Sequence, residues 1–292
     1  MNAVAQARAC FLRACELDVA VRKPGNVSRA SSGHGMHAEL FIASAHAAAG
    51  PLFEAGACVG ERIEAAVEAS WAVAGCNTNL GILLLCAPIA RSVERWPEAR
   101  TPAALREAIE SVLSELDLAD ARAAYRAIAR ANPGGLGAAP SEDVHSLPSV
   151  DLRAAMALAA PRDSIARQYR DGYADLFDAA PTPLGKGFSL METLDFSQPD
   201  VSTTMAVQRL YLALLSRFAD SHIVRIHGEP VAHIVMSAAQ AWAARSRAVS
   251  MLDSDPQFAA WDAALKADRI NPGTTADLTV AALLIAGLAR TV

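Results

Sequence analysis

Residues 75–90 read Gly75-Cys76-Asn77-Thr78-Asn79-Leu80-Gly81-Ile82-Leu83-Leu84-Leu85-Cys86-Ala87-Pro88-Ile89-Ala90, and this stretch predicts the centre of the fold. The run from Ile82 to Ala87 has no polar face, so it must be buried on every side, in a large core or in a membrane. It is far shorter than the ~20 apolar residues that cross a bilayer, and Pro88 is expected to interrupt the helix. The stretch therefore predicts a buried core helix.

Three small polar residues, Asn77, Thr78 and Asn79, stand at the entrance of this helix. The first N–H groups of a helix have no partners inside it, and any of these side chains could cap them. Capping needs only one side chain. We therefore interpret the group as the wall of a polar pocket at the buried end of the helix.

The composition favours a large helical core. Of the 292 residues, 52% are hydrophobic, 20% are charged and only 5% are aromatic, and alanine is abundant. A net charge of -5 argues against a nucleic-acid partner, which normally requires a basic face. The composition still allows a local group of Arg and Lys around an anionic small molecule.

The cysteine pattern and the chain ends predict a soluble, cytoplasmic protein without a membrane partner. The five cysteines are odd in number and form no Cys-x-x-Cys pair, so neither a disulfide framework nor a zinc knuckle is indicated. Arg8 and Arg13 interrupt the N-terminal segment, which therefore lacks the apolar region of a secretory signal. The apolar run 278–289 is too short to span a bilayer.

Helical periodicity recurs along the whole chain, and sustained period-2 alternation is absent. The interval 181–187 is expected to be a turn-rich connection, and no linker marks a domain boundary. We therefore expect one all-α domain, a single large helical domain over residues 1–292. The expected helices, besides the central one, are 3–21, 37–49, 61–74, 102–116, 119–130, 151–160, 163–178, 207–218, 230–251, 255–267 and a last one after 273.

Three loops combine Pro-Gly with small polar residues: Lys23-Pro24-Gly25-Asn26, Asn132-Pro133-Gly134-Gly135, and Asn271-Pro272-Gly273-Thr274-Thr275-Ala276-Asp277. The third leads into an apolar helix. A helix N-terminus approached through glycine offers free N–H groups and the positive end of the dipole, which suit a phosphate. The alternative is a capping box in which Asp277 folds back on its own helix. Three similar loops in one chain favour binding.

The segment 220–228 gathers Asp220, His222 and Arg225 directly after the strongest amphipathic helix. Arg225 suits bidentate phosphate recognition, and Asp220 or His222 could serve as acid or base. A carboxylate could also hold Mg²⁺ together with substrate phosphates. The alternative is a polar C-terminal cap, which would not need the aspartate. The run 162–170 is interpreted instead as a solvated helix face, and His34-x-x-His37 is weak as a zinc signal.

Four motifs resemble, in order and spacing, those of the triphosphoribosyl-dephospho-CoA synthase family: Lys23-Pro24-Gly25, Asn77-Thr78-x-x-Gly81, Asp220…Arg225…Gly228 and Pro272-Gly273-x-x-Ala276-Asp277-Leu278. The resemblance covers the chain from about residue 15 onward. It implies an all-helical enzyme in which the 2′-hydroxyl of dephospho-CoA attacks the ribose C1′ of ATP. Adenine leaves, and the triphosphate stays on the transferred ribose.

The chain departs from the family pattern inside the expected pocket. Asn79-Leu80 replaces a His-Lys pair, and Glu39 stands where two aspartates follow a histidine. Ser221-His222 replaces Thr-Asn. The variant looks more like a divergent branch seen in methanogens and C1-using bacteria, which leaves the acceptor open.

The sequence thus predicts an Mg²⁺-dependent transferase acting on ATP, with dephospho-CoA as the default acceptor. The alternatives are a related transferase acting on a methanopterin or methanofuran precursor, a non-catalytic nucleotide-binding protein, and a metal-dependent hydrolase. Homo-oligomerisation is left open. The candidate catalytic residues are Asp220, Asp277, Glu39 and His222, of which Asp220 and Asp277 are also the candidate metal ligands. The candidate nucleotide-binding residues are Lys23, Gly25, Asn77, Thr78, Asn79, Arg225, Gly273, Thr274 and Thr275.

Overall fold

The structure, a computed structural model, describes residues 2–137, 141–179 and 199–289. Within these ranges it contains fourteen α-helices, one 3₁₀ turn and no strand, so the expected all-α class is confirmed. The expected turns at 181–187 lie outside the described residues. In chain order the elements are α1 (Ala3–Ala20), α2 (Ala38–Leu52), α3 (Val59–Ala74), α4 (Leu80–Arg95), α5 (Pro102–Ser114), α6 (Leu118–Ala131), α7 (Leu152–Ala159), α8 (Ser164–Asp171), α9 (Ala174–Ala179), α11 (Val201–Leu215), α12 (Ser221–His227), α13 (Glu229–Arg245), η1 (Leu252–Ser254), α14 (Pro256–Ala267) and α15 (Gly273–Leu288).

Helix α4 is the buried core helix that its sequence predicts, since every residue from 80 to 90 is buried. The expected interruption at Pro88 is wrong, because α4 continues through it. Proline has no N–H to donate to the carbonyl four residues back, which here is that of Leu84. The Tyr169 hydroxyl donates to this carbonyl instead, at 2.6 Å. A second tyrosine, Tyr173, donates to the next carbonyl along the helix at 2.7 Å.

Two hydrophobic cores share helix α11. The larger core packs α1 to α9 together with α15, and the smaller one packs α12, α13, η1 and α14. Along α11, Val207, Leu210 and Leu214 belong to the larger core, whereas Tyr211 and Leu215 belong to the smaller. The strong apolar stripe of this helix is therefore buried on two sides. The expectation of one domain stays a prediction.

Three segments differ from the expected helices. The interval 163–178 forms two helices, α8 and α9, because Gly172 and Tyr173 between them adopt φ values of 60° and 59°. Residues 221–227 form the separate helix α12, with Asp220 as its N-cap, and not a polar C-terminal cap of the preceding helix. Helix α13 ends at Arg245, earlier than expected.

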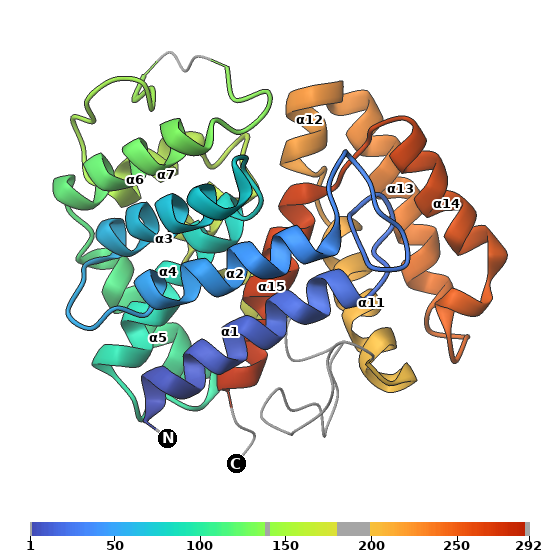
Figure 1. The fold of residues 1–292 in the computed structure, drawn as a ribbon, viewed down its shortest axis with the longest axis horizontal. Helices are drawn as coiled ribbons and strands as arrows, with labels where there is room; N and C mark the ends of the chain where they lie inside the picture. Colours follow the sequence, from blue (N-terminus) through green and yellow to red (C-terminus); the bar gives the residue numbers. More distant parts are fainter. Residues whose placement is uncertain (1, 138–140, 180–198, 290–292) are drawn as a thin grey trace.

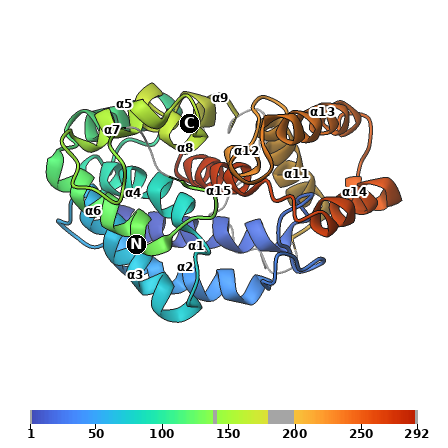
Figure 2. The same ribbon diagram turned by 90° about the horizontal axis from the view of Figure 1, so that it is seen from above.

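Helix α15 runs through the middle of the molecule (Figure 1). Seen from above, it lies between α8 on one side and α11 and α12 on the other (Figure 2). Its N-terminal turn meets α12 and the loop that comes after α1, which places the predicted motifs around one point. No helix in the described part of the chain is long and apolar enough to cross a membrane.

Candidate active site at the N-termini of α12 and α15

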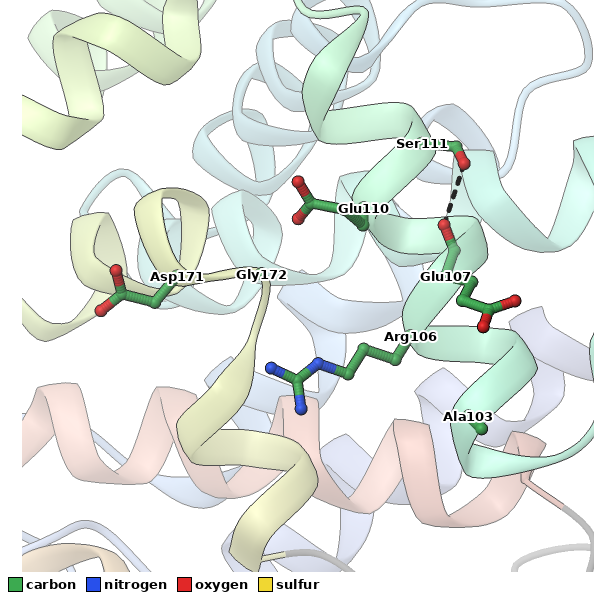
Figure 3. Close-up of a pocket in the computed structure, with 7 residues that line it drawn as sticks. All are labelled: Ala103, Arg106, Glu107, Glu110, Ser111, Asp171 and Gly172. Atoms are coloured by element: carbon green, nitrogen blue, oxygen red, sulfur yellow. Dashed lines mark hydrogen bonds between the residues drawn. The ribbon is translucent and has the colours of Figure 1, made fainter.

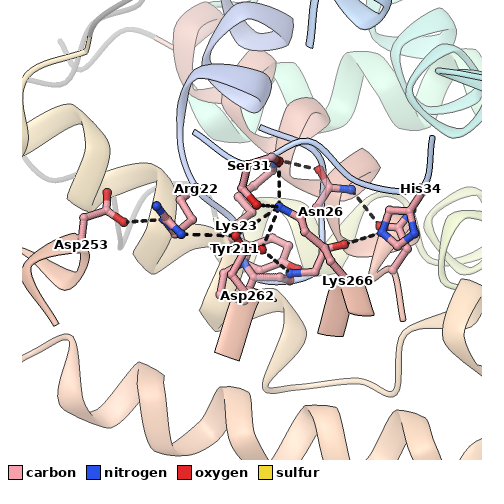
Figure 4. Close-up of polar contacts among 12 residues, drawn as sticks. Arg22, Lys23, Asn26, Ser31, His34, Tyr211, Asp253, Asp262 and Lys266 are labelled. Atoms are coloured by element: carbon pink, nitrogen blue, oxygen red, sulfur yellow. Dashed lines mark hydrogen bonds and ion pairs between the residues drawn. The ribbon is translucent and has the colours of Figure 1, made fainter. Parts of the chain in front are cut away.

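The loop after α1 folds around the ammonium group of Lys23 (Figure 4). This side chain is completely buried. Its Nζ lies 2.5 Å from the Asp18 carbonyl oxygen, 3.1 Å from Asp18 Oδ1 and 2.9 Å from Asn26 Oδ1. Two of the three N–H donors of the ammonium thus have hydrogen-bond acceptors, and the contact with Asp18 Oδ1 is an ion pair. Lys23 therefore shapes the loop in this structure, and its assignment as a phosphate ligand stays a prediction.

Gly25 is the point where the loop packs against the segment before α15. Its φ is 82°, and a Cβ atom there would lie 2.7 Å from Pro272 Cδ, so only glycine fits. Its N–H donates to Asp262 Oδ1 at 2.9 Å. The neighbouring Asn26 amide donates to Asn271 Oδ1 at 3.0 Å. Two of the three Pro-Gly loops thus come together.

Asp220 joins α12 to α15 through four hydrogen bonds and is only 2% exposed. Its Oδ1 accepts the N–H groups of His222 and Ile223 at 2.9 and 3.1 Å. Its Oδ2 accepts both the N–H and the hydroxyl of Thr275 at 2.7 Å. Burial raises the pKa of this carboxyl, and the Thr275 bonds oppose that rise. The N-terminus of α15, expected as a phosphate seat, therefore already holds an anion of the chain itself.

The alternative capping box at 274–277 does not form. Helix α15 begins at Gly273 without a side-chain cap, so Thr274 and Asp277 lie inside its first turns. Asp277 points instead at the start of α4. A Cβ atom on Gly81 would lie 2.1 Å from Asp277 Oδ2, so the carboxylate rests directly on the Gly81 backbone.

The Asp277 carboxyl makes no hydrogen bond or ion pair to another described residue. Its side chain is half-buried. Burial raises its pKa well above the usual range, and the negative charges of Asp18 and Asp220 raise it further. This group is therefore a partly buried carboxyl with a raised pKa and no partner in the described chain.

Of the polar residues before α4, one caps the helix and two have donors unpaired in the described chain, as expected for the wall of a pocket. Asn77 Oδ1 accepts the N–H of Leu80 at 3.1 Å, which is a capping bond. The Thr78 hydroxyl and the Asn79 amide nitrogen are enclosed and have no partner in the described chain. Asn79 as a whole is 6% exposed. Buried polar groups are usually paired, so these two donors point to a ligand or water at the N-terminus of α4.

Arg225 is held by a residue that the sequence placed on a solvated face. Its Nη1 donates to Asp163 Oδ2 at 2.8 Å, and its Nε is enclosed without a partner in the described chain. The remaining Pro-Gly loop, at residues 132–135, lies beside this helix, since a Cβ atom on Gly135 would be 3.0 Å from the Arg225 carbonyl oxygen. The start of α8, the loop at 132–135 and α12 itself therefore meet at Arg225.

His222 packs against the first residue of α15. Its ring carbons lie 3.7 Å from where a Cβ atom on Gly273 would be. Burial lowers the pKa of His222 to about 4, and the positive charges of Arg225, His34 and His227 add to this effect. The imidazole is therefore neutral at pH 7.

The site thus has an acidic and a basic side. The negative charges of Asp18 and Asp220 raise the proton affinity of Asp277, which lies in the first turns of α15. His222 and Arg225 come from α12, and His34 is bound to the Gly25 carbonyl oxygen at 2.8 Å. Such a division suits a ligand with an anionic end and an end that develops positive charge.

Glu39 lies apart from these contacts. It is exposed in the first turn of α2 and makes no hydrogen bond or ion pair within the described part of the chain. Its catalytic role stays a prediction.

Two shallow hollows lie outside these contacts. One, between α5 and the junction of α8 and α9, contains none of the predicted site residues (Figure 3). It is lined by Ala103, Arg106, Glu107, Glu110, Ser111, Asp171 and Gly172. The other is formed by residues 132–137 and His145, next to α12.

The donor set does not form a resident metal centre. Among the described residues, no three His, Cys, Asp or Glu side chains are placed to hold a metal ion. Asp220 already accepts four hydrogen bonds, which leaves it poorly suited as a ligand. Asp277 is the carboxyl that could still meet an Mg²⁺ ion arriving with substrate phosphates, a common mode of Mg²⁺ binding.

Asp18 and Asp163 are the site residues that the sequence reasoning did not select. Asp18 precedes Lys23 by five residues within α1, where it resembles any other polar position of an amphipathic helix. Asp163 lies in a charged run typical of a solvated face. The helix-capping preference of aspartate was the available signal for Asp163, because it N-caps α8.

Comparisons with known proteins agree with this architecture. The family model described as ATP:dephospho-CoA triphosphoribosyl transferase matches residues 4–292. No curated protein gives a significant match. The crystal structure of a protein from Archaeoglobus fulgidus, described as a putative triphosphoribosyl-dephospho-CoA synthase, is similar with a TM-score of 0.62 and 23% identity. The similarity covers 85% of this chain and 98% of that chain, and at this identity it shows the fold. Because the family model spans nearly the whole sequence, the chain is a transferase that belongs to the ATP:dephospho-CoA triphosphoribosyl transferase family.

Proposed function

We propose that this protein transfers the triphosphoribosyl group of ATP to the 2′-hydroxyl of dephospho-CoA and releases adenine. The bond between ribose C1′ and the adenine nitrogen breaks, and a bond between C1′ and the hydroxyl oxygen forms. The hydroxyl loses one proton and adenine gains one, so the reaction balances. The observation that carries the proposal is the free Asp277 carboxyl, one helical turn from the residue against which His222 packs.

Asp277 is the proposed proton donor to the departing adenine. A departing base needs a proton, and a carboxyl can supply it when its pKa is raised, as in glycoside hydrolysis. Asp277 meets this requirement by burial and by its neighbours Asp18 and Asp220. Once ionised, the same carboxylate would stabilise the positive charge that develops at C1′.

His222 is the proposed acceptor of the hydroxyl proton. It is neutral, as an acceptor must be, because its pKa is about 4. Gly273, which His222 contacts, and Asp277 lie four residues apart on one face of α15, or about 6 Å along the axis. The proposed base therefore contacts α15 about one helical turn from the proposed acid.

The triphosphate is placed on the basic side, at Arg225. A guanidinium recognises phosphate oxygens through paired N–H donors, and only one donor of Arg225 has a protein partner in the described chain. Thr78 and Asn79 supply further donors at the N-terminus of α4. An Mg²⁺ ion bound to the phosphates of ATP would reduce their negative charge.

Asp220 is proposed to hold two helices of the site in place. It ties the start of α12, which carries His222, to the start of α15, which carries Asp277. Lys23 and Gly25 likewise fix the loop that borders the site. Glu39, exposed on α2 and apart from the site contacts, is left as a weaker candidate.

The acceptor is the part of the proposal with a specific alternative. The residues before α4 include Asn79, whose amide nitrogen is unpartnered in the described chain, and the helix then begins with Leu80, which is buried in the core. Leu80 therefore offers no charge to an acceptor. This favours a second candidate, in which the same transfer is made to a C1-coenzyme precursor of the methanopterin or methanofuran type.

Free adenine is the decisive readout. Purified protein is incubated with ATP and Mg²⁺, with and without dephospho-CoA, and adenine is measured by chromatography. Adenine that forms only with dephospho-CoA, together with the matching mass gain on the acceptor, supports the proposal. Adenine in both tubes indicates a hydrolase. ATP binding without adenine in either tube indicates another acceptor or a non-catalytic binding protein.

The matched control is Asp151→Asn. Asp151 is an N-cap like Asp220, but it lies on α7 outside the contacts of the site. Adenine formation should persist in Asp151→Asn and fall below detection in Asp277→Asn. Equal activity of the two variants would remove Asp277 from the chemistry.

A further inference from the structure

Asp163 combines two separate tasks with its two carboxylate oxygens. Oδ1 accepts the N–H groups of Ile165 and Ala166 at 2.9 and 3.0 Å and so caps α8. Oδ2 accepts Arg225 Nη1 at 2.8 Å, across 62 residues of sequence. The side chains of Asp163 and Arg225 are 24% and 20% exposed, so this ion pair is largely withdrawn from water.

A second contact fixes the same pair of helices. The N–H of Ser164, the first residue of α8, donates to Ser221 Oγ at 2.9 Å, and the two serine hydroxyl oxygens lie 3.3 Å apart. Ser221 is the first residue of α12. The N-terminal turns of α8 and α12 are therefore joined at two adjacent points, and Arg225 is anchored one turn further along α12.

Arg225 remains able to bind a further anion. A guanidinium has five N–H donors, and one hydrogen bond from this group is formed within the described chain. Its Nε is enclosed without a partner there. Without Asp163 the long arginine side chain would be free to sample several rotamers, and ordering it again would cost binding free energy.

We propose that Asp163 is a positioning residue for substrate binding: its Oδ2 aims the Arg225 guanidinium at a phosphate group of the nucleotide. This inference rests on the proposed function, since it takes Arg225 as the phosphate ligand. It assigns to Asp163 a role separate from its role in capping α8.

The two roles separate in Asp163→Asn. Asparagine caps a helix as well as aspartate, so its Oδ1 can keep the α8 cap. Its second polar atom is an N–H₂ group, which cannot accept a hydrogen bond from Arg225. Asp163→Ala loses both functions. The matched control is Asp151→Asn, an N-cap aspartate that has no arginine partner in the described chain.

The experiment measures the Kd of ATP and of inorganic triphosphate by titration calorimetry, the KM and kcat of adenine release, and Tm. Asp163→Asn should weaken binding of both ligands about tenfold, the equivalent of about 1.4 kcal/mol. Its Tm should stay near that of the wild type, and kcat should change less than KM. Asp163→Ala should show the same loss of affinity with a lower Tm, and Asp151→Asn should bind like the wild type.

A double-variant cycle with Arg225→Gln completes the test. Because Asp163 acts through Arg225, Asp163→Asn/Arg225→Gln should bind triphosphate no more weakly than Arg225→Gln alone. Additive losses, or unchanged affinity in Asp163→Asn, would overturn the positioning role. Failure of the proposed function is detected separately, by measuring binding to the wild-type protein. A wild-type protein that binds neither ATP nor triphosphate would refute that function and this inference together.

Discussion

Gly81→Ala tests the contact between α4 and α15 at the centre of the site. Alanine normally stabilises a helix relative to glycine by about 0.5–1 kcal/mol. At Gly81 the new Cβ would lie 2.1 Å from Asp277 Oδ2, 2.6 Å from Asp277 Cγ and 2.7 Å from Ile165 Cδ1. No real Cβ contact is this short, so the carboxylate and the isoleucine must both move. Overpacking of this kind costs about 1–3 kcal/mol.

The two effects oppose each other, and the net change predicted for Gly81→Ala is a destabilisation of about 0–2.5 kcal/mol. Gly50→Ala is the matched control, because Gly50 also lies within a helix but has no atom within 4 Å of an added Cβ. It should gain about 0.5–1 kcal/mol. The free energies of unfolding from urea titrations should therefore differ by about 1–3 kcal/mol between the two variants.

Removing the obstructing carboxylate should relieve the strain. In an Asp277→Ala background, Gly81→Ala should cost less than it does in the wild type, since the two Asp277 atoms nearest to the added Cβ are gone. Adenine release should fall in Gly81→Ala alone and persist in Gly50→Ala. If Gly81→Ala is as stabilising as Gly50→Ala, Asp277 does not pack against α4 in this way, and the reasoning fails.

Four further outcomes are expected. Asp277→Asn should abolish adenine release. It should also become more stable than the wild type as the pH rises above 3.8, because the wild-type protein loses stability when the pH passes from the ordinary pKa of the carboxyl to its raised pKa in the folded state. Urea unfolding at several pH values checks the sign. Asp220→Asn should lose about 2–5 kcal/mol of stability, since the buried N–H and hydroxyl of Thr275 lose their acceptor, and an unchanged urea midpoint would contradict that bonding. His222 has a pKa lowered to about 4, so the wild type should lose stability as the pH falls from 6.5 toward 4, and His222→Gln should flatten this slope. Lys23→Met should lower the free energy of unfolding by about 3–5 kcal/mol, because it leaves the buried Asp18 carboxylate unpaired. If the variant is as stable as the wild type, the ion pair is dispensable.

Local sequence patterns were sufficient for most of the helices. Thr101 before Pro102 predicts the start of α5, and the structure shows its hydroxyl accepting the N–H of Ala104. The apolar run at 82–87 predicts a buried helix by composition alone. Such features depend on residues three or four positions apart, so they can be read directly from the sequence.

The roles of the polar residues depended on partners far away in the chain. Pro88 alone predicts a break, and only Tyr169, packed against α4, supplies the missing hydrogen bond. Asp220 alone suggests a free catalytic acid, whereas Thr275 takes up one of its oxygens. The sequence around Asp163 suggests a solvated helix face, whereas in the structure Asp163 accepts a hydrogen bond from Arg225.

The all-α class, the buried central helix and the family motifs can all be inferred without coordinates, because each rests on local periodicity or on residue order. The availability of individual side chains cannot: Asp277 has no hydrogen-bond partner in the described chain, whereas Asp220 accepts four hydrogen bonds and Lys23 is enclosed by Asp18 and Asn26. The physical reason is that burial and hydrogen bonding, which set the pKa and availability of a side chain, are properties of its neighbours in space. Those neighbours can come from opposite ends of the chain, as Gly81 of α4 and Asp277 of α15 do.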